Sequence, residues 1–390
     1  MATQALKALN RQLLVMQHLS MKASEPHSAV SVSEGCCGIN SQNFRESFSS
    51  FWARTNDFRD SYLLSELKPK GGLARAWTVR GTMHTFPSKD YYVHVFGSGR
   101  KKILSRYDSW AKKLGIPSRD VRVESIYQPL LDQVKGKPVT SNHIKTYMIE
   151  RLAQLGLKSK MRLRRGWSSQ PTYGPTWTGI TEMSYLGLLV SAGRQGSESL
   201  WMRTSDWLSS GRKVPDPEDC VTELVRRYIQ RYGPVSRSDI GYWANSLYAD
   251  EVGKSIEALR KDLVQEHLEG SREVFYCLGG DFDEFAEPPR TIILPRFDSL
   301  MMGYKDRSRF LLPERLKDVS KPQGMIHQTI LVDGFVAATW EKKRERDRII
   351  VSVTSFRNLK GRERRSIEEK FDEYSDYLGT GISVEFSGYS

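Results

Sequence analysis

The sequence is poor in cysteine and histidine, with four cysteines and seven histidines among 390 residues. Cys36 and Cys37 are adjacent while Cys220 and Cys277 stand far apart, so the spacing fits neither a disulfide framework nor a zinc site. No two histidines flank a glutamate at the spacing of a helical metal site. We therefore expect free thiols in a reducing compartment, no metal and no cofactor.

Long apolar runs are also lacking. No stretch approaches the roughly 18 apolar residues that a membrane span needs, and residues 1–24 lack the continuous apolar core of a signal peptide. We expect a cytoplasmic protein with no membrane partner. Acidic residues are outnumbered, 46 against 59 Lys and Arg, which gives a net charge of +13. This excess favours a polyanionic partner, with nucleic acid the first candidate and an anionic membrane surface the second.

Two carboxamides, Asn40 and Gln42, directly precede a well-signalled helix. Asn43 is a good N-cap residue, Glu46 stands at the capping-box position, and an apolar stripe follows at helical spacing, formed by Phe44, Phe48, Phe51 and Trp52. Carboxamides donate and accept hydrogen bonds but take up no proton at neutral pH. They can orient a water molecule but cannot act as a strong base. Alone, the motif is more often an ordinary helix cap and loop.

Three stretches predict three helices followed by a β-hairpin, the order of a winged helix. The best-defined lies between Cys220 and Leu278, where the first helix stops at Gly233-Pro234 and the hairpin turns at residues 269–272. The other two have helices at 6–19, 29–37 and 44–57 with strands at 76–79 and 83–86, and helices at 121–134, 141–155 and 178–192 with a wing turning at 195–197. Tandem winged helices in an α+β fold are the expected scaffold.

After Gly280 the pattern changes to strands, at 291–294, 330–332, 335–340, 348–356 and 382–386, with an amphipathic helix at 361–378. Asp333-Gly334 is a strong hairpin signal. We expect a small β-barrel or curled sheet. The polar segment 296–307 indicates a turn held by a tyrosine and an ion pair, with a cleft-facing role as the alternative. The expected domains are 1–115, 116–212, 213–285 and 286–390.

Duplicated winged helices usually indicate a transcription regulator, but the helix at residues 250–262 is slightly acidic and would read the major groove poorly. Basic residues gather elsewhere, ahead of Trp167, Tyr173 and Trp177, and comprise Lys158, Lys160, Arg162, Arg164 and Arg165. Positive charge among aromatics suits backbone contact with base stacking or wedging. A solvated basic loop beside core aromatics is the alternative. Arg194 and Arg203 flank the middle wing, where they could grasp the DNA backbone.

Five motifs in this order resemble the AlkZ-type DNA glycosylases, a bacterial winged-helix family: residues 38–42, 75–84, 293–298, 303–307 and 331–334. The resemblance spans almost the whole chain, and it implies a bacterial protein that is nucleoid-associated when bound to DNA. It implies a C-shaped body of three tandem winged helices plus a C-terminal β-barrel, acting as a monomer on double-stranded DNA that carries alkylated purines. Family members excise N-alkylated purines, including bulky adducts and interstrand crosslinks left by genotoxic natural products, and some protect the producing bacterium.

The family's catalytic motif is two glutamines separated by one residue, and it matches Asn40 and Gln42. Asn is shorter than Gln by one methylene, about 1.5 Å, and a misplacement of about 1 Å can cost on the order of 10²-fold in rate. The resemblance also gives DNA-facing roles to Arg54, Arg80 and His84. The alternatives are a hairpin-turn residue for Arg80 and a satisfied strand histidine for His84.

The implied chemistry agrees with these residue types. An N7- or N3-alkylated purine is cationic and leaves without protonation, so positioning a water against the anomeric carbon can suffice. We hypothesise that Gln42 holds the water, that Asn40 assists it or the sugar, and that the enzyme is monofunctional, since the motif offers no reactive amine. A catalytically silent damaged-DNA-binding protein stays open because of Asn40. A dimeric transcription regulator also stays open, although no dimerisation heptad is evident.

Overall fold

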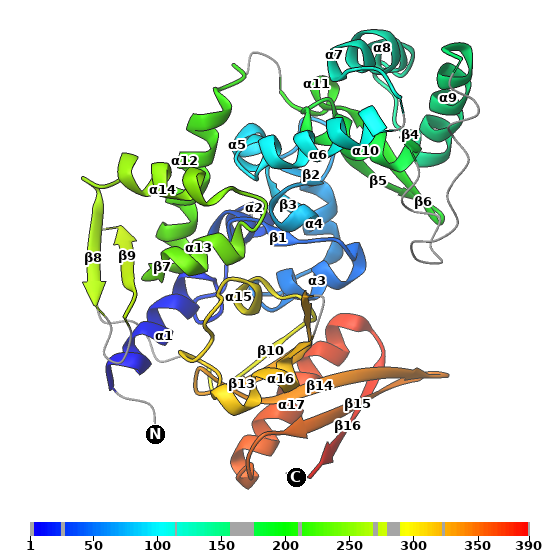
Figure 1. Ribbon diagram of the computed structural model, residues 1–390. Helices are drawn as coiled ribbons and strands as arrows, with labels where there is room; N and C mark the ends of the chain where they lie inside the picture. The colour runs from blue at the N-terminus through cyan, green and yellow to red at the C-terminus, as the bar shows by residue number, and fades with distance from the viewer. Residues whose placement is uncertain are drawn as a thin grey trace. The chain divides into compact units, whose positions relative to one another are not determined.

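The computed structural model describes residues 4–24, 28–113, 115–156, 175–209, 213–267, 272–278, 289–321 and 324–388. The chain forms two compact units, each assembled from segments distant in sequence. Unit 1 comprises Met1–Leu64, Arg227–Trp243 and Arg260–Ser390, and unit 2 comprises Ser65–Arg226 and Ala244–Leu259. Both units mix helices with strands (Figure 1), which confirms the α+β class. The four consecutive domains stay a prediction.

Unit 1 begins with α1 (Gln4–Met16), α2 (Ser28–Gly35) and α3 (Phe44–Trp52), with the two-residue strand β1 (Ile39–Asn40) between the last two helices. The apolar stripe of α3 faces inward as expected, because Phe51 is fully buried and the Trp52 ring centroid lies 4.8 Å from that of Tyr374. The helix ends five residues before the predicted end at residue 57. Asn43 occupies the N-cap position, but its side chain makes no capping hydrogen bond, so that detail of the prediction is wrong.

The C-terminal part of unit 1 is a five-stranded sheet in the order β10-β13-β14-β15-β16. Its strands are β10 (Thr291–Leu294), β13 (Gln328–Val332), β14 (Phe335–Glu345), β15 (Arg348–Ser355) and β16 (Gly381–Ser387). Neighbours are antiparallel except β15 and β16, which are parallel. The predicted hairpin at Asp333-Gly334 joins β13 to β14.

The predicted β-barrel is wrong, since β10 and β16 are unpaired edges of an open sheet in the described part of the chain. The physical reason is the connection through α17 (Gly361–Leu378), which returns the chain parallel to β15 and contacts both β10 and β16. This helix buries Ile367, Phe371 and Tyr374, as expected for the inner face of an amphipathic helix. Shorter elements precede it: α15 (Ser299–Met302), α16 (Leu316–Val319), and the paired strands β11 (Ser320–Lys321) and β12 (Met325–Ile326).

The stretch from Cys220 to Leu278 contains the predicted elements. The helices are α12 (Pro217–Tyr232), which ends where Gly233-Pro234 was expected to stop it, α13 (Arg237–Trp243) and α14 (Ala249–Ala258). The strands β7 (Val235–Ser236), β8 (Leu263–His267) and β9 (Val274–Leu278) form a sheet in the order β7-β9-β8. The predicted turn at 269–272 lies outside the described residues except for its last position.

Unit 2 contains the first predicted hairpin, β2 (Leu73–Trp77) and β3 (Met83–Pro87), joined through residues 79–81. Its helices include α14, the part of α12 up to Arg226, α5 (Tyr91–Phe96), α6 (Arg100–Lys113), α7 (Arg119–Arg122), α8 (Gln128–Gln133), α9 (Ser141–Gln154), α10 (Pro175–Tyr185) and α11 (Thr204–Trp207). The boundary between the two units falls within α4 (Asp60–Glu66). A short π-helix, Val123–Tyr127, joins α7 to α8. Two buried clusters form its core, one containing Trp77 and Trp201 and the other Phe86 and Trp207.

The middle wing is formed by β5 (Leu189–Gln195) and β6 (Glu198–Arg203), with β4 (Val139–Thr140) on the other side of β6. Its turn falls at the predicted residues. The predicted helix 178–192 is too long, because α10 ends at Tyr185 and Gly187 takes a left-handed φ of +76° before the strand. Within the described ranges, the structure contains no helix with the length and apolar character of a membrane span.

Candidate functional site

The carboxamide loop, residues 38–42, leaves α2 through an unusual backbone. Cys37 and Gly38 both adopt left-handed conformations, with φ of 52° and 94°, so the chain reverses immediately after the helix. The side chains then alternate, because Ile39 and Ser41 are buried, Asn40 is half-buried and Gln42 is exposed. This alternation is that of an extended segment, in which residues two apart share a side. The two carboxamides therefore lie on the more exposed side of the loop.

The side chain of Asn40 orders the backbone of Gln42. The amide N–H of Gln42 donates a hydrogen bond to Oδ1 of Asn40 over 3.1 Å. This short turn within the loop fixes where the Gln42 side chain begins. It also engages Oδ1 of Asn40, so that the Asn40 amide group retains its N–H donors.

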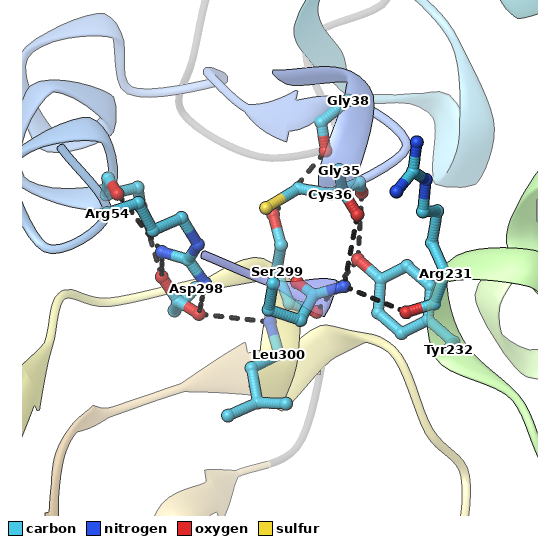
Figure 2. Close-up of polar contacts among 11 residues, drawn as sticks. Gly35, Cys36, Gly38, Arg54, Arg231, Tyr232, Asp298, Ser299 and Leu300 are labelled. Atoms are coloured by element: carbon cyan, nitrogen blue, oxygen red, sulfur yellow. Dashed lines mark hydrogen bonds and ion pairs between the residues drawn. The ribbon is translucent and has the colours of Figure 1, made fainter. Parts of the chain in front are cut away.

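Side chains from three distant segments hold the carbonyl groups just before the carboxamides (Figure 2). Nε2 of Gln17 donates to Gly35 O over 3.4 Å, the Tyr232 hydroxyl to Cys36 O over 2.9 Å, and Oγ of Ser299 to Gly38 O over 3.4 Å. Gln17 also donates to Arg231 O over 3.3 Å, which ties α1 to α12. Buried polar backbone requires such partners. The loop is thus supported by Gln17 just after α1, by Tyr232 at the end of α12 and by Ser299 in α15, and these three residues belong to unit 1.

A buried ion pair lies behind the loop and joins α3 to the start of α15. The Arg54 guanidinium donates two hydrogen bonds of 2.7 Å to Asp298, one to each carboxylate oxygen, and both side chains are fully buried. Asp298 also caps α15 through Leu300 N and accepts a hydrogen bond from Ser50. Burial opposes the charge on Arg54, but Asp298 outweighs it and raises the pKa of the guanidinium.

This burial corrects the expectation that Arg54 contacts DNA, because the guanidinium is 0% exposed and both of its terminal nitrogens bind Asp298. The segment 296–307 has the structural role expected of it. The Asp298 ion pair holds one part, and the buried Tyr304 hydroxyl donates to Tyr232 O over 2.6 Å in another.

Residues 38–43 contain no acid, histidine, lysine or cysteine, so the loop carries no group that titrates near neutral pH. Cys36 and Cys37, just before the loop, are both buried. Burial raises the pKa of the Cys36 thiol to about 11. It is therefore protonated and unsuited to nucleophilic attack. The loop can donate and accept hydrogen bonds and can orient a water molecule, but it offers neither a strong base nor an amine for covalent catalysis.

His84 and Arg80 belong to the β2–β3 hairpin of unit 2, whereas the carboxamides belong to unit 1. His84 is 6% exposed, and its Nδ1 lies 2.8 Å from Oγ1 of Thr78. Burial lowers the pKa of His84 to about 4, so the ring is neutral. The expected DNA contact is thereby corrected to the alternative, a satisfied strand histidine. Arg80 is partly exposed at the turn, with a left-handed φ of 63°.

The two arginines of the middle wing differ in what they contact. Arg194 is exposed and donates to Ser197 O across the wing turn. Arg203 is partly buried and lies 3.6 Å from Asp206 and 4.0 Å from Asp132, so local carboxylates already neutralise it. The basic segment with Lys160, Arg162, Arg164 and Arg165 lies outside the described residues.

Sequence reasoning missed the supports of the loop: Gln17, Tyr232, Ser299 and the pairing of Arg54 with Asp298. Asp298 ends the motif at 293–298 and, with Ser299, falls in the polar segment 296–307, so the sequence marked this region but not its contact with the loop. Gln17 directly follows α1 and Tyr232 is the last residue of α12, and no local pattern distinguished either residue.

Comparison with known proteins gives concordant results. The family model for AlkZ-like DNA glycosylases matches residues 34–377. A relative from Streptomyces sahachiroi, named as an interstrand DNA cross-link repair glycosylase, is 22% identical over 277 residues, covering 69% of this chain and 70% of the relative. The solved structure of Streptomyces sahachiroi DNA glycosylase AlkZ aligns with a TM-score of 0.78 and 19% identity, over 99% of this chain and all of that one. This likeness shows a shared fold.

The family match defines the class of the protein as a DNA glycosylase, an enzyme of DNA repair. The chain belongs to the AlkZ-like DNA glycosylase family, because the family model covers most of its length. The resemblance inferred from five sequence motifs is thereby confirmed.

Proposed function

We propose that the protein hydrolyses the N-glycosidic bond of N7- or N3-alkylated purines in double-stranded DNA, acting as a monofunctional glycosylase. The observation that carries the proposal is the loop itself, in which an exposed Gln42 is fixed by Asn40 and no titratable group is present. Alkylation at N7 or N3 makes the purine cationic, so it departs as a neutral base without protonation by the enzyme. The neutral loop suits such a substrate.

In the proposed mechanism, the Gln42 carboxamide oxygen accepts a hydrogen bond from a water and directs the water's lone pair at the anomeric carbon. The sugar develops oxocarbenium character as the bond to the purine breaks. The water then adds to the sugar and its proton passes to solvent. The Asn40 N–H donors are available for the water or for a sugar oxygen, since Oδ1 already binds Gln42 N. Rate acceleration in this scheme comes from positioning and charge stabilisation.

The hydrogen bonds that hold the loop backbone would also keep the Gln42 carboxamide in a fixed position. A carboxamide places water accurately only if its backbone does not move, and three side-chain donors hold the carbonyls of Gly35, Cys36 and Gly38. Misplacement of about 1 Å would cost on the order of 10²-fold. We infer that the loop is built as a rigid platform and that Asn40, shorter than the family glutamine, serves first to set the position of Gln42.

For the scaffold, we propose three tandem winged helices that bind duplex DNA as a monomer. The order helix, helix, helix, hairpin supports this for α12 to β9, and the hairpins β2–β3 and β5–β6 follow helices in the same manner. The Streptomyces relative is named for interstrand cross-link repair. We extend the proposed substrates to bulky N7-guanine adducts and crosslinks on that basis, with a role in general repair or self-resistance.

The test of function is base release from duplexes containing N7-methylguanine, a bulky N7-guanine adduct, or only normal bases. We expect release from at least one alkylated duplex and none from the normal duplex, and abasic strands that break only after heat or alkali. Release of normal guanine at a similar rate would refute selection for cationic purines. Strand breaks by β-elimination without heat or alkali would refute the monofunctional mechanism.

A second function, a catalytically silent protein that binds damaged DNA, is favoured by one observation. Asn40 replaces a family glutamine, and its side-chain oxygen is engaged within the loop. This alternative predicts tighter binding to alkylated than to normal DNA with no base released from either. Replacing Asn40 by Gln distinguishes the two functions, because a silent protein would gain release whereas a loop shaped around Asn40 would lose rate.

A further inference from the structure

Helix α6 of unit 2 carries a concentration of positive charge that the proposed catalytic mechanism does not use. Its 14 residues include six Lys or Arg and a single acid, Asp108. That acid is already engaged, because Asp108 accepts hydrogen bonds from both Arg119 and Arg122. The helix therefore presents an excess of uncompensated cations.

One face of α6 borders an open pocket of about 410 Å³, within the size range of roughly 300–1,000 Å³ for pockets that hold small organic groups. Its lining residues on the helix recur at helical spacing: Lys102, Arg106, Trp110 and Lys113, with two serines between them. Tyr248 forms the opposite wall. Cations and two aromatic rings thus surround a space open to solvent.

Lys102 holds the tyrosine wall against the helix. Its Nζ donates to Asn245 O over 3.3 Å and to Leu247 O over 3.4 Å, and lies 5.4 Å from the centroid of the Tyr248 ring. These contacts lie within unit 2. Tyr248 nevertheless remains 37% exposed, so its ring is fixed in place while part of it still faces solvent.

Arg106 and Lys113 remain available to a ligand. Both are exposed, and neither forms an ion pair with any residue of the described chain. They stand about two turns apart on the helix, roughly 10 Å along its axis at 1.5 Å per residue. Consecutive phosphates of a single strand lie a few ångströms apart, so this separation spans a short run of backbone.

We propose that this α6 surface binds an unpaired segment of DNA, with phosphates at Arg106 and Lys113 and a base in the pocket against Trp110 and Tyr248. Guanidinium and ammonium groups complement phosphate, and aromatic rings stack on any base. A base can enter such a pocket only when it is not paired. The inference rests on the proposed function for the identity of the nucleic acid, and it adds a contact that neither the carboxamide loop nor the wings provide.

Binding of a fluorescent 12-residue oligothymidylate to the full chain tests the surface. We expect an Arg106→Glu/Lys113→Glu variant to bind at least about tenfold more weakly than wild type. Its slope of log K against log salt should flatten by about 1.4, since each single-strand phosphate contact contributes about 0.7. The matched control is Lys135→Glu/Lys137→Glu, which makes the same charge change at two exposed positions of unit 2 and should stay within about twofold of wild type.

A second variant separates stacking from charge. Tyr248→Ala should weaken oligothymidylate binding several-fold without changing the salt slope, and it should have no effect on an oligomer of abasic sugar phosphates. Unchanged oligothymidylate affinity in both Arg106→Glu/Lys113→Glu and Tyr248→Ala would overturn the proposal. So would loss of binding to phosphatidylserine vesicles with oligothymidylate binding intact, because that result would assign the surface to a membrane.

The two proposals fail in different ways. The binding assay requires no base release, so an active glycosylase whose α6 variants bind oligothymidylate normally refutes only the α6 surface. A chain that releases no base, while its α6 variants lose oligothymidylate binding, refutes only the glycosylase mechanism. Gln42→Ala should bind oligothymidylate as wild type does, and a large loss there would contradict the assignment of binding to α6.

Discussion

At the scale of single residues, the proposed site depends on two carboxamides that have different roles. The Gln42 side chain is exposed and can contact a substrate. The side-chain oxygen of Asn40 instead accepts a hydrogen bond from the backbone N–H of Gln42. A glutamine at position 40 would carry its oxygen about 1.5 Å further and would not make the same short turn. The shorter residue therefore accounts for the conformation of this loop.

Asn40→Ala should reduce the single-turnover rate of base release by about 10- to 100-fold while leaving DNA affinity nearly unchanged. The reason is loss of the hydrogen bond that positions Gln42. Rapid-quench kinetics with N7-methylguanine DNA measure the rate, and fluorescence anisotropy measures the affinity. A rate within twofold of wild type would show that Asn40 does not position Gln42 for catalysis.

His84 predicts a pH dependence of stability. Burial lowers its pKa to about 4, below the ordinary value of 6.5, so the unfolded chain binds the proton more readily. The neutral His84 therefore contributes to the free energy of unfolding in full above pH 6.5. This contribution, up to about 3 kcal/mol, is lost as the pH falls toward 4. His84→Gln should flatten this fall in urea unfolding between pH 7 and 4.5. His143→Gln, at an exposed histidine of the same unit, should leave the fall as in wild type. An equally steep fall in both variants would contradict the account.

At the scale of elements, sequence patterns predicted most helices and strands because apolar periodicity is a local property. The elements between Cys220 and Leu278 and the Asp333-Gly334 hairpin agree with the structure. In the first pattern, α3 ends five residues early and α4 comes before the hairpin. Helix α10 ends before Gly187, whose left-handed backbone is a local stop signal inside the predicted helix. The other errors arose where non-local geometry decides, because the path of α17 leaves the C-terminal sheet open where a barrel was expected. The supports of the loop escaped prediction for the same reason, since Arg54 and Asp298 are 244 residues apart.

The ion pair between α3 and α15 should dominate the stability of unit 1 at this junction. Asp298→Asn leaves the Arg54 charge buried without its partner, which should cost about 3–5 kcal/mol in the free energy of unfolding. Glu373→Gln, which breaks the more exposed pair with Lys370, should cost less than about 1 kcal/mol. Urea denaturation measures both. Equal losses in the free energy of unfolding would show that the buried Arg54–Asp298 pair contributes no more to stability than the exposed pair.

At the scale of the whole molecule, the net charge of +13 sets the long-range attraction to DNA. Charge alone gives no specificity, so it should govern affinity for any duplex, and the carboxamide loop should govern which base leaves.

Duplex binding should therefore weaken steeply with salt, with log K falling linearly against log salt by about 0.9 per phosphate contacted. Arg162→Ala/Arg164→Ala/Arg165→Ala should flatten that slope, because the basic segment is proposed to contact phosphates. Anisotropy titrations from 50 to 300 mM salt, roughly the range in which counterion release is measured, provide the slope. An unchanged affinity and slope would exclude this segment from the DNA contact.

The measurement that most directly tests the account is single-turnover release of N7-methylguanine by Gln42→Ala, compared with wild type and with Asn43→Ala. Asn43 is a neighbouring exposed carboxamide whose side chain makes no capping bond, so it controls for the loss of an amide at this loop. We predict that Gln42→Ala loses at least about 100-fold in rate while Asn43→Ala stays close to wild type. Equal rates in all three proteins would show that the carboxamide at position 42 does not carry the chemistry.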